Sequence, residues 1–184
     1  MKEATYCAFL RGVNVNGRTM KMAEVCGVFE GAGMKAVSSV LASGNIIFRS
    51  DRPVDQLRGA LERAMSDHFG SQVSLFVKSA GEIAELLSAV PFAPDPGLHI
   101  YAYVCEAGFE TVLMEKFREI APLPNERAAI SGGLFFWQVD KGATLDAGFS
   151  KILGHKSMRD KFTSRNIGTI QKIRDKIRAA GVAK

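Results

Sequence analysis

Strand-like and helix-like apolar patterns follow one another over residues 5–77 in an order that few folds accommodate. The first run, TYCAFL, has no polar face, which predicts a central strand covered on both sides. Later runs alternate between helical spacing and β-rich composition, giving the order β-α-β-β-α-β of a ferredoxin-like unit. In chain order the six runs occupy 5–10, 22–29, 36–41, 45–48, 54–69 and 73–77.

The second half of the chain repeats this order less completely. A strand-like run at 98–104 precedes a helical pattern, and Gly132-Gly133 then joins two apolar runs, which is a strong hairpin signal. The remainder is helical in character, with breaks at Gly154 and near 163–168. We therefore predict an α+β protein with two consecutive ferredoxin-like halves, antiparallel sheets and a helical C-terminal segment. The proline-rich stretch at 91–97 suggests halves of 1–91 and 92–184.

Composition narrows the class of protein. Of 184 residues, 47% are hydrophobic and 23% charged, which suits a globular chain rather than a disordered one. No apolar run approaches the ~20 residues that span a bilayer, and the first residues do not resemble a signal peptide. A cytoplasmic location away from membranes is therefore expected. The three cysteines lie far apart, without metal-ligand spacing, so we expect neither disulfides, nor a metal, nor a cofactor.

Positive charge is concentrated near the C-terminus. Residues 150–184 carry a net charge of +8, whereas residues 1–149 carry −3. Such asymmetry is typical of chains that meet an anionic partner. However, Arg174 and Arg178 flank one side of the last apolar stripe, and Lys172 and Lys176 flank the other. The pattern is therefore not a single face that would track a phosphate backbone.

A glycine-bearing segment, residues 10–18, leaves the first strand and enters the first helical stripe. Loops of this kind can turn backbone N–H groups towards a phosphate, and arginine can add bidentate contacts. The segment is not a P-loop, because Arg18-Thr19 follows Gly17 where Lys-Ser/Thr is required. The alternative is a loop whose asparagines bond to their own backbone. The candidate ligand-binding residues are Arg11, Asn14, Asn16 and Arg18.

A second group of candidates lies in the tight link between the runs at 36–41 and 45–48. Ser43 and Asn45 offer small polar groups there. In a ferredoxin-like unit the first and third strands are antiparallel neighbours, so Arg11 and Asn14 are expected near Asn45 on one rim of the sheet. The alternative is a turn that needs Gly and Asn for backbone reasons alone.

A third group precedes the last helical stripe. Hydroxyl, guanidinium and amide groups next to free helix N–H groups suit an oxyanion. The alternative is simple N-capping by Asn166 or Thr169. The candidates for anion binding are Thr163, Ser164, Arg165 and Asn166.

Three stretches are similar to the domain-of-unknown-function 1697 (DUF1697) family of bacterial proteins. They are FLRGVNVNGRTMKMAEV at 9–25, LASGNIIF at 41–48 and FTSRNIGTIQKI at 162–173. Two positions depart from the family pattern: Asn16 stands where glycine is more frequent, and Ile167 where an aromatic residue is common. The resemblance implies two small α+β halves and assigns no catalytic residue.

Three functions remain open from the sequence, and whether the chain is an enzyme is undecided. The favoured one is a binding module for a phosphorylated small molecule or a nucleic acid. The others are a small enzyme with a polar site at the Arg11/Asn45 rim and a protein-interaction module without ligand chemistry. The three histidines form no metal or catalytic motif. Ligand identity, oligomeric state and pathway do not follow from the sequence.

Overall fold

The computed structural model describes residues 3–12, 14–15, 18–155, 158 and 160–182. Contacts between residues group the chain into two compact units, residues 1–84 with 171–184, and residues 85–170. The division at residues 91 and 92 expected from the sequence stays a prediction. Within the described residues, no helix combines the length and the apolar character needed to cross a membrane.

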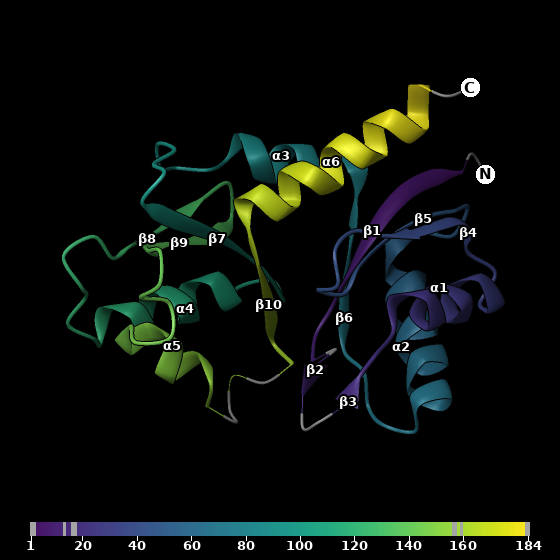
Figure 1. The fold of residues 1–184 in the computed structure, drawn as a ribbon, viewed down its shortest axis with the longest axis horizontal. Helices are drawn as coiled ribbons and strands as arrows, with labels where there is room; N and C mark the ends of the chain where they lie inside the picture. The colour runs from purple at the N-terminus through teal and green to yellow at the C-terminus, as the bar shows by residue number, and fades with distance from the viewer. Residues whose placement is uncertain (1–2, 13, 16–17, 156–157, 159, 183–184) are drawn as a thin grey trace. The chain divides into compact units, whose positions relative to one another are not determined.

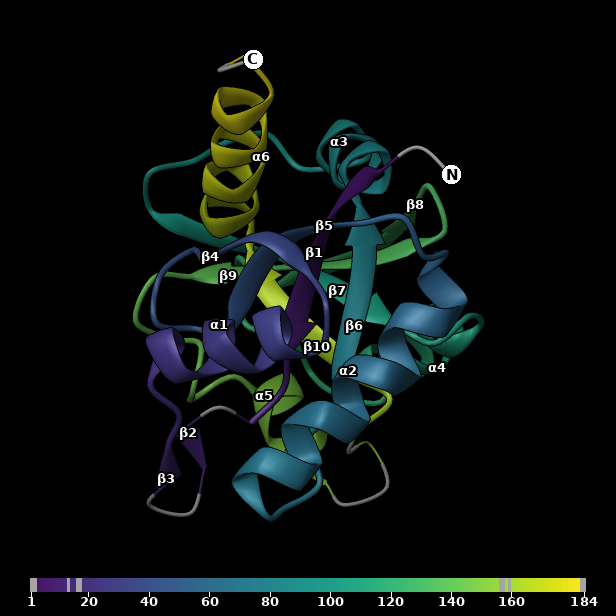
Figure 2. The ribbon, with the colours of Figure 1, turned by 90° about the vertical axis from the view of Figure 1, so that its right-hand side faces the viewer.

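The first unit is built on a four-stranded antiparallel sheet in the order β4-β5-β1-β6 (Figure 1). Strand β1 lies between β5 and β6, which confirms the central position predicted for the first apolar run. Figure 2 shows α1 and α2 on the same side of this sheet. The elements are β1 Ala4–Leu10, α1 Met22–Gly31, β4 Lys35–Ser39, β5 Asn45–Ser50, α2 Val54–Phe69 and β6 Leu75–Ser79.

Alternate residues of β1 and β5 are buried on opposite sheet faces. Tyr6 and Phe48, partners across the two strands, belong to the core shared with α1 and α2. Cys7 and Ile47, the next pair, point to the other face and are also buried. Burial on both faces explains why the first run has no polar side.

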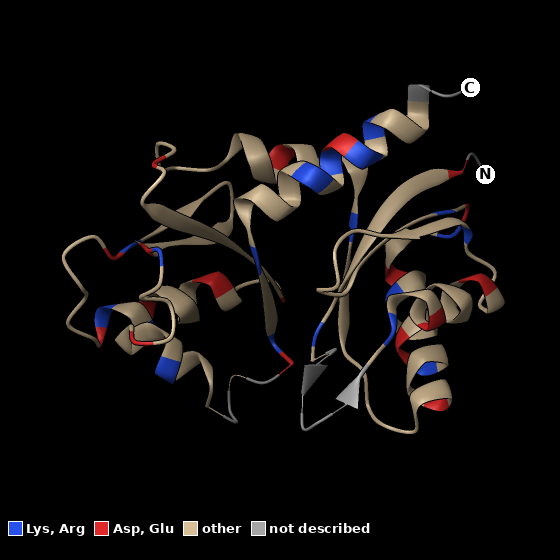
Figure 3. Cartoon of the chain, viewed as in Figure 1, with Lys and Arg blue, Asp and Glu red and all other residues tan. Residues whose placement is uncertain are grey.

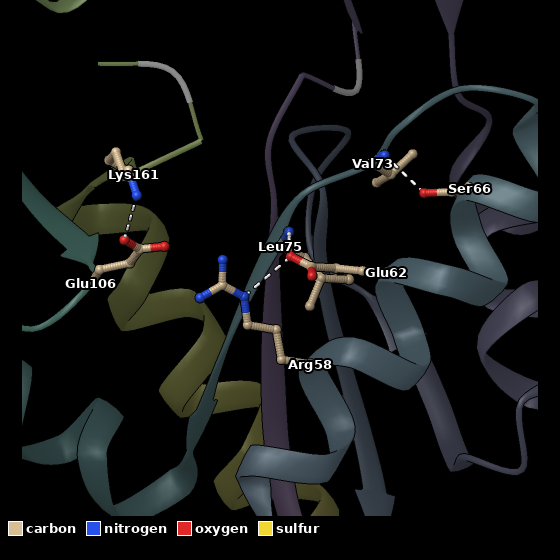
Figure 4. A network of polar contacts seen from close by, with 7 residues as sticks. All are labelled: Arg58, Glu62, Ser66, Val73, Leu75, Glu106 and Lys161. Atoms are coloured by element: carbon tan, nitrogen blue, oxygen red, sulfur yellow. Dashed lines mark hydrogen bonds and ion pairs between the residues drawn. The ribbon is translucent and has the colours of Figure 1, made fainter. Parts of the chain in front are cut away.

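A polar network joins α2 to the chain entering β6 (Figure 4). The Glu62 carboxylate accepts hydrogen bonds from the Arg58 side chain at 3.1 Å and from the Leu75 backbone amide at 3.0 Å. The Arg58 guanidinium also lies 4.8 Å from the centre of the Phe76 ring. These contacts fix the start of β6 against the helix, so we assign them a structural role.

Residues 10–18 differ from the prediction. A short strand β2, Asn14–Val15, pairs with β3, Arg18–Thr19, to form a two-stranded antiparallel ribbon. The segment expected as a plain loop thus contains a ribbon, and phosphate binding by its backbone stays a prediction. Runs of two residues are too short to produce a periodic signal in the sequence.

The second unit has the same strand arrangement as the first. Its sheet order, β10-β7-β9-β8, places the first strand of the unit between its fourth and third strands. Gly132 and Gly133, with φ of 56° and 72°, join β8 to β9, which confirms the predicted hairpin. The elements are β7 Leu98–Cys105, α4 Phe109–Arg118, β8 Arg127–Ser131, β9 Leu134–Asp140, α5 Gly148–Leu153 and β10 Phe162–Asn166.

The sequence predicted a break between helices near residues 163–168, but the structure has a strand, β10, at residues 162–166. This strand pairs with β7 and completes the sheet of the second unit. Helix α6, Ile167–Val182, follows at once, and helix α3, Ala80–Ser88, follows β6 in the same manner. Sequence periodicity misses β10 because it lies at the sheet edge and only Phe162 and Thr163 are buried in it. Phe162 contributes its ring to the core beside Tyr103, at 5.4 Å between ring centres.

Aromatic residues fill the core of the second unit. Phe135 and Trp137 lie in this core with Phe149. The Trp137 indole N–H donates to the buried Glu126 carboxylate at 3.0 Å, and the Leu123 amide donates to its other oxygen at 2.9 Å. The carboxylate therefore anchors the loop before β8.

The two hairpin glycines provide a matched test of this turn. We expect Gly132→Ala to lower the free energy of unfolding more than Gly133→Ala does. Each alanine would be strained by about 1–2 kcal/mol at a positive φ, but only at position 132 would the new Cβ lie 3.0 Å from the Ala89 side chain. Urea unfolding of both variants measures the difference. Equal losses would contradict the close approach, and Gly133→Asn, which tolerates positive φ, is the control.

A capping box of Ser79 and Glu82 holds the start of α3. The Ser79 amide and hydroxyl donate to Glu82 at 2.8 and 2.9 Å, and the Glu82 amide donates to the Ser79 hydroxyl at 3.2 Å. Lys78 adds an ion pair at 2.8 Å. Burial acts to raise the pKa of Glu82, but the bonds from Lys78 and Ser79 outweigh it and hold that pKa below its ordinary value.

A carboxyl with a lowered native pKa stabilises the fold at neutral pH, and this contribution is lost as the pH falls below about 4.5 through the native pKa. We therefore expect Glu82→Gln to lower the free energy of unfolding at pH 7 by about 0.5–1 kcal/mol, a modest effect because the carboxylate is partly exposed. The difference should shrink at pH 3. Urea unfolding at both pH values tests this, and a loss independent of pH would rule out the charge.

Candidate functional site

The predicted rim exists at the level of the backbone. Phe9 of β1 pairs with Asn45 of β5, and the Leu10 amide donates to the Gly44 carbonyl at 2.8 Å. The Asn45 side chain, however, is fully buried and donates to the Val40 carbonyl at 3.0 Å and the Ser43 hydroxyl at 2.9 Å. These bonds match the alternative in which asparagine supports its own turn.

The other residues of this group lie on or beside the ribbon. Arg11 is half-buried, and its amide donates to the Ser74 carbonyl at 2.9 Å. Asn14 belongs to β2 and Arg18 to β3, whereas Asn16 falls outside the described residues. Ligand binding at this rim stays a prediction.

The group at the β10–α6 junction is joined by local hydrogen bonds. The Arg165 guanidinium donates to the Thr163 hydroxyl at 2.7 Å and the Ser164 carbonyl at 2.8 Å. The Asn166 side-chain oxygen accepts from the Gly168 amide at 2.9 Å, which confirms the N-cap alternative for this residue. Its amide nitrogen lies 3.0 Å from Nδ1 of His99. Anion binding around Arg165 stays a prediction.

The charges of the C-terminal segment are partly compensated where the structure describes them. Figure 3 shows an acidic residue among the Lys and Arg residues of α6. Arg174 bonds to Asp175 at 2.8 Å, and Lys161 pairs with Glu106 at 3.0 Å, a contact also drawn in Figure 4. Lys176 differs, because its Nζ donates to the main-chain carbonyl of Ser39 at 2.9 Å and forms no ion pair within the described chain.

Lys176 also lines a pocket that the sequence did not reveal. A cavity of about 250 Å³ lies in the first unit, on the sheet face turned away from α1 and α2. Thr5 of β1 and Arg49 of β5 are direct partners across the sheet, and Ser38 of β4 is opposite Ile47. The remaining lining residues are Ala36 at a bulge of β4 and Ala180 of α6.

The electrostatics of this Arg49–Lys176 pocket favour an anion. No lining residue carries a carboxylate. Within the described chain the Arg49 side chain makes no hydrogen bond or ion pair, and the Thr5 and Ser38 hydroxyls have no recorded partner. The pocket thus presents two positive charges that no lining carboxylate balances, together with two hydroxyl groups.

The same lining contains no histidine, cysteine or acid, and its groups with nucleophilic or proton-transfer chemistry are Lys176 and the hydroxyls of Thr5 and Ser38. Burial raises the pKa of the Cys26 thiol, and the positive charge of Lys176 lowers it by a smaller amount, so the neutral thiol is favoured. Among the described residues there is no group of three or more His, Cys, Asp or Glu that would hold a metal. The arrangement offers positive charge and hydroxyl groups to a ligand.

One feature of the sequence, the position of Arg49, could have indicated this pocket. Arg49 interrupts the apolar run NIIF-R-S in a strand that the fold buries on both faces. A charged residue at such a position calls for a partner or a ligand. What the sequence did not show is that Lys176, more than a hundred residues later, lines the same cavity.

Asn45 supplies a test of its turn-supporting role. Asn45→Ala should lower the free energy of unfolding by about 1–3 kcal/mol, because it leaves the Val40 carbonyl without its donor in a buried turn. Ser43→Ala should cost less, since Ser43 is exposed and only one bond is removed. Thermal or urea unfolding compares the two. An unchanged stability of the Asn45 variant would contradict its turn-supporting role.

Comparison with known proteins agrees with this fold. A family model described as "Protein of unknown function (DUF1697)" matches residues 3–136. That range contains the first two stretches of resemblance, at 9–25 and 41–48, and ends before the third. No curated protein matches the sequence.

One solved structure resembles the chain over nearly its whole length. It is described as the conserved bacterial protein SP0830 from Streptococcus pneumoniae, with a TM-score of 0.77 and 24% sequence identity. The alignment covers 96% of this chain and 99% of that one. At this identity the likeness supports the α+β architecture and carries no information on ligands.

Proposed function

We propose that this chain, which belongs to the DUF1697 family, is a binding module for a small phosphate-bearing molecule held at the Arg49–Lys176 pocket. The observation that carries the proposal is the convergence of Arg49 and Lys176 on one cavity without a carboxylate. An uncompensated pair of cations attracts a doubly charged anion, and a guanidinium can grip two phosphate oxygens at once.

The form of the pocket favours a small molecule over a nucleic acid. A cavity of about 250 Å³ has room for a phosphate group and a short organic portion. A polynucleotide needs a continuous basic track, whereas the described cations of α6 are divided by the Arg174–Asp175 pair. Thr5 and Ser38 hydroxyls add donors suited to single phosphate oxygens.

No specific observation supports the two other functions, a small enzyme or a protein-interaction module. The polar rim at Arg11 and Asn45 offers no buried base, since the Asn45 amide is engaged in its turn. A docking face would require a contiguous apolar patch. The exposed large hydrophobic residues of the described chain are Leu41, Ile130 and Leu145, which come from separate segments of the sequence.

Titration with inorganic phosphate and with a sugar phosphate, followed by isothermal calorimetry or by amide chemical shifts, tests the proposal. Wild type should bind in a saturable manner that weakens as salt rises, because Arg49 and Lys176 attract the anion electrostatically. Arg49→Gln should weaken binding about tenfold or more, since it removes a charge-assisted donor. Lys176→Gln should weaken it as well, by a smaller factor.

The matched control is Arg178→Gln, which removes an exposed charge from the same helix without touching the lining. It should leave the affinity nearly unchanged, so that the effect of net charge is separated from that of the pocket. Saturable binding that Arg49→Gln does not alter would place the anion elsewhere. Absence of binding to wild type at millimolar concentrations of both probes would reject the proposed function.

A further inference from the structure

The second unit contains its own pocket, of about 390 Å³. It lies on the sheet face turned away from α4 and α5, because its strand residues alternate with those of the aromatic core. Arg127 of β8 and Gln138 of β9 are direct partners across the sheet, and Leu98 of β7 lies beside them. Residues 91–95, the proline-rich stretch after α3, also line the pocket.

This position corresponds to that of the Arg49–Lys176 pocket in the first unit. Each pocket rests on the first, second and third strands of its own ferredoxin-like unit, on the face without that unit's paired helices. Each also presents an arginine, Arg49 or Arg127, for which the described chain provides no hydrogen bond or ion pair. The shared position indicates two related sites, and the different side chains indicate different ligands.

The polar groups of the second pocket are of both signs. Arg127 supplies a free guanidinium, and Asp95 supplies a carboxylate of which one oxygen accepts the Gly97 amide at 2.6 Å. Gln138 is only 6% exposed, and its amide nitrogen donates to the Asn125 carbonyl at 3.4 Å. Within the described chain no bond is recorded for the side-chain oxygen of Gln138 or the second oxygen of Asp95.

We propose that this pocket binds a free α-amino acid as its zwitterion. Arg127 binds the carboxylate through paired N–H donors, and Asp95 with the Gln138 oxygen accepts the ammonium. Phe92, with the neighbouring prolines, lines an apolar wall against which the side chain of the ligand packs. The Arg127 guanidinium, the second Asp95 oxygen and the Gln138 side-chain oxygen would then each have a hydrogen-bond partner on the ligand.

Charge balance separates this ligand from the anion of the first unit. Arg127 and Asp95 leave the pocket without net charge, so a phosphate monoester would be repelled by the carboxylate that the Arg49–Lys176 pocket lacks. A cation would in turn face the guanidinium. A ligand bearing an ammonium and a carboxylate on the same carbon leaves neither group of the pocket uncompensated.

The test uses the full chain and amide chemical shifts during titration with L-leucine and L-phenylalanine. Either amino acid should shift the Gln138 side-chain amide and the amides of β8 in a saturable way. N-acetyl-leucine, which lacks the ammonium, and leucinamide, which lacks the carboxylate, should bind at least about tenfold more weakly, because each leaves one charged group of the pocket unpaired. Arg127→Gln should weaken zwitterion binding by a similar factor.

Two matched variants complete the experiment. Arg118→Gln removes an exposed arginine of α4 in the same unit and should not change amino-acid binding. Arg49→Gln should also leave it unchanged, which separates this site from the phosphate site of the first unit. Equal binding of leucine, its acetyl derivative and its amide would overturn the assignment of charges. No saturable shift with either amino acid, or shifts that persist in Arg127→Gln, would overturn the site itself.

Discussion

The first unit depends on the burial of β1 between β5 and β6. The antiparallel register pairs Phe9 with Asn45 and Thr5 with Arg49, so the two ends of the strand are fixed by the same ladder. At one end the ladder produces the Asn45 turn, and at the other it places Arg49 beside a threonine hydroxyl. The inner face supplies the core with α1 and α2, and the outer face supplies the floor of the pocket. A slip of the register by one residue would exchange these faces and remove both.

The second unit obeys the same topological rule with different chemistry. Its core is aromatic, and a buried carboxylate, Glu126, accepts the indole N–H of Trp137. Burial strongly raises the pKa of Tyr103, and the neighbouring Tyr101 and Glu126 add to this effect. The neutral phenol is thus maintained inside the core. Similar folds therefore arise from sequences that share an order of elements and little else, as the 24% identity to the Streptococcus pneumoniae protein also illustrates.

The sequence predicted the elements that have strong periodicity or special turn residues. The apolar run at 5–10 and the Gly132-Gly133 hairpin appear as predicted, because each depends on local chemistry alone. The ribbon within residues 14–19 and the edge strand β10 were missed because their pairing partners, not their own pattern, define them. The burial of the candidate site residues could not be predicted from the sequence for a related reason. Asn45 was a candidate for ligand binding because of its type and its place in the turn, whereas its burial follows from how the turn folds back on Val40.

The distribution of net charge along the sequence was a still weaker indication of the proposed Arg49–Lys176 pocket. The segment 150–184 carries +8, but the structure pairs Lys161 with Glu106 and Arg174 with Asp175, and it engages Arg165 with Thr163. Arg49 belongs instead to residues 1–149, which carry a net charge of −3, so a count of charges does not indicate an anion site there. What distinguishes Arg49 is the lack of a carboxylate within its cavity, a property of the neighbouring strands and of one helix turn. The potential that a ligand meets is set by which cations remain uncompensated in a confined space, and only the folded arrangement determines that.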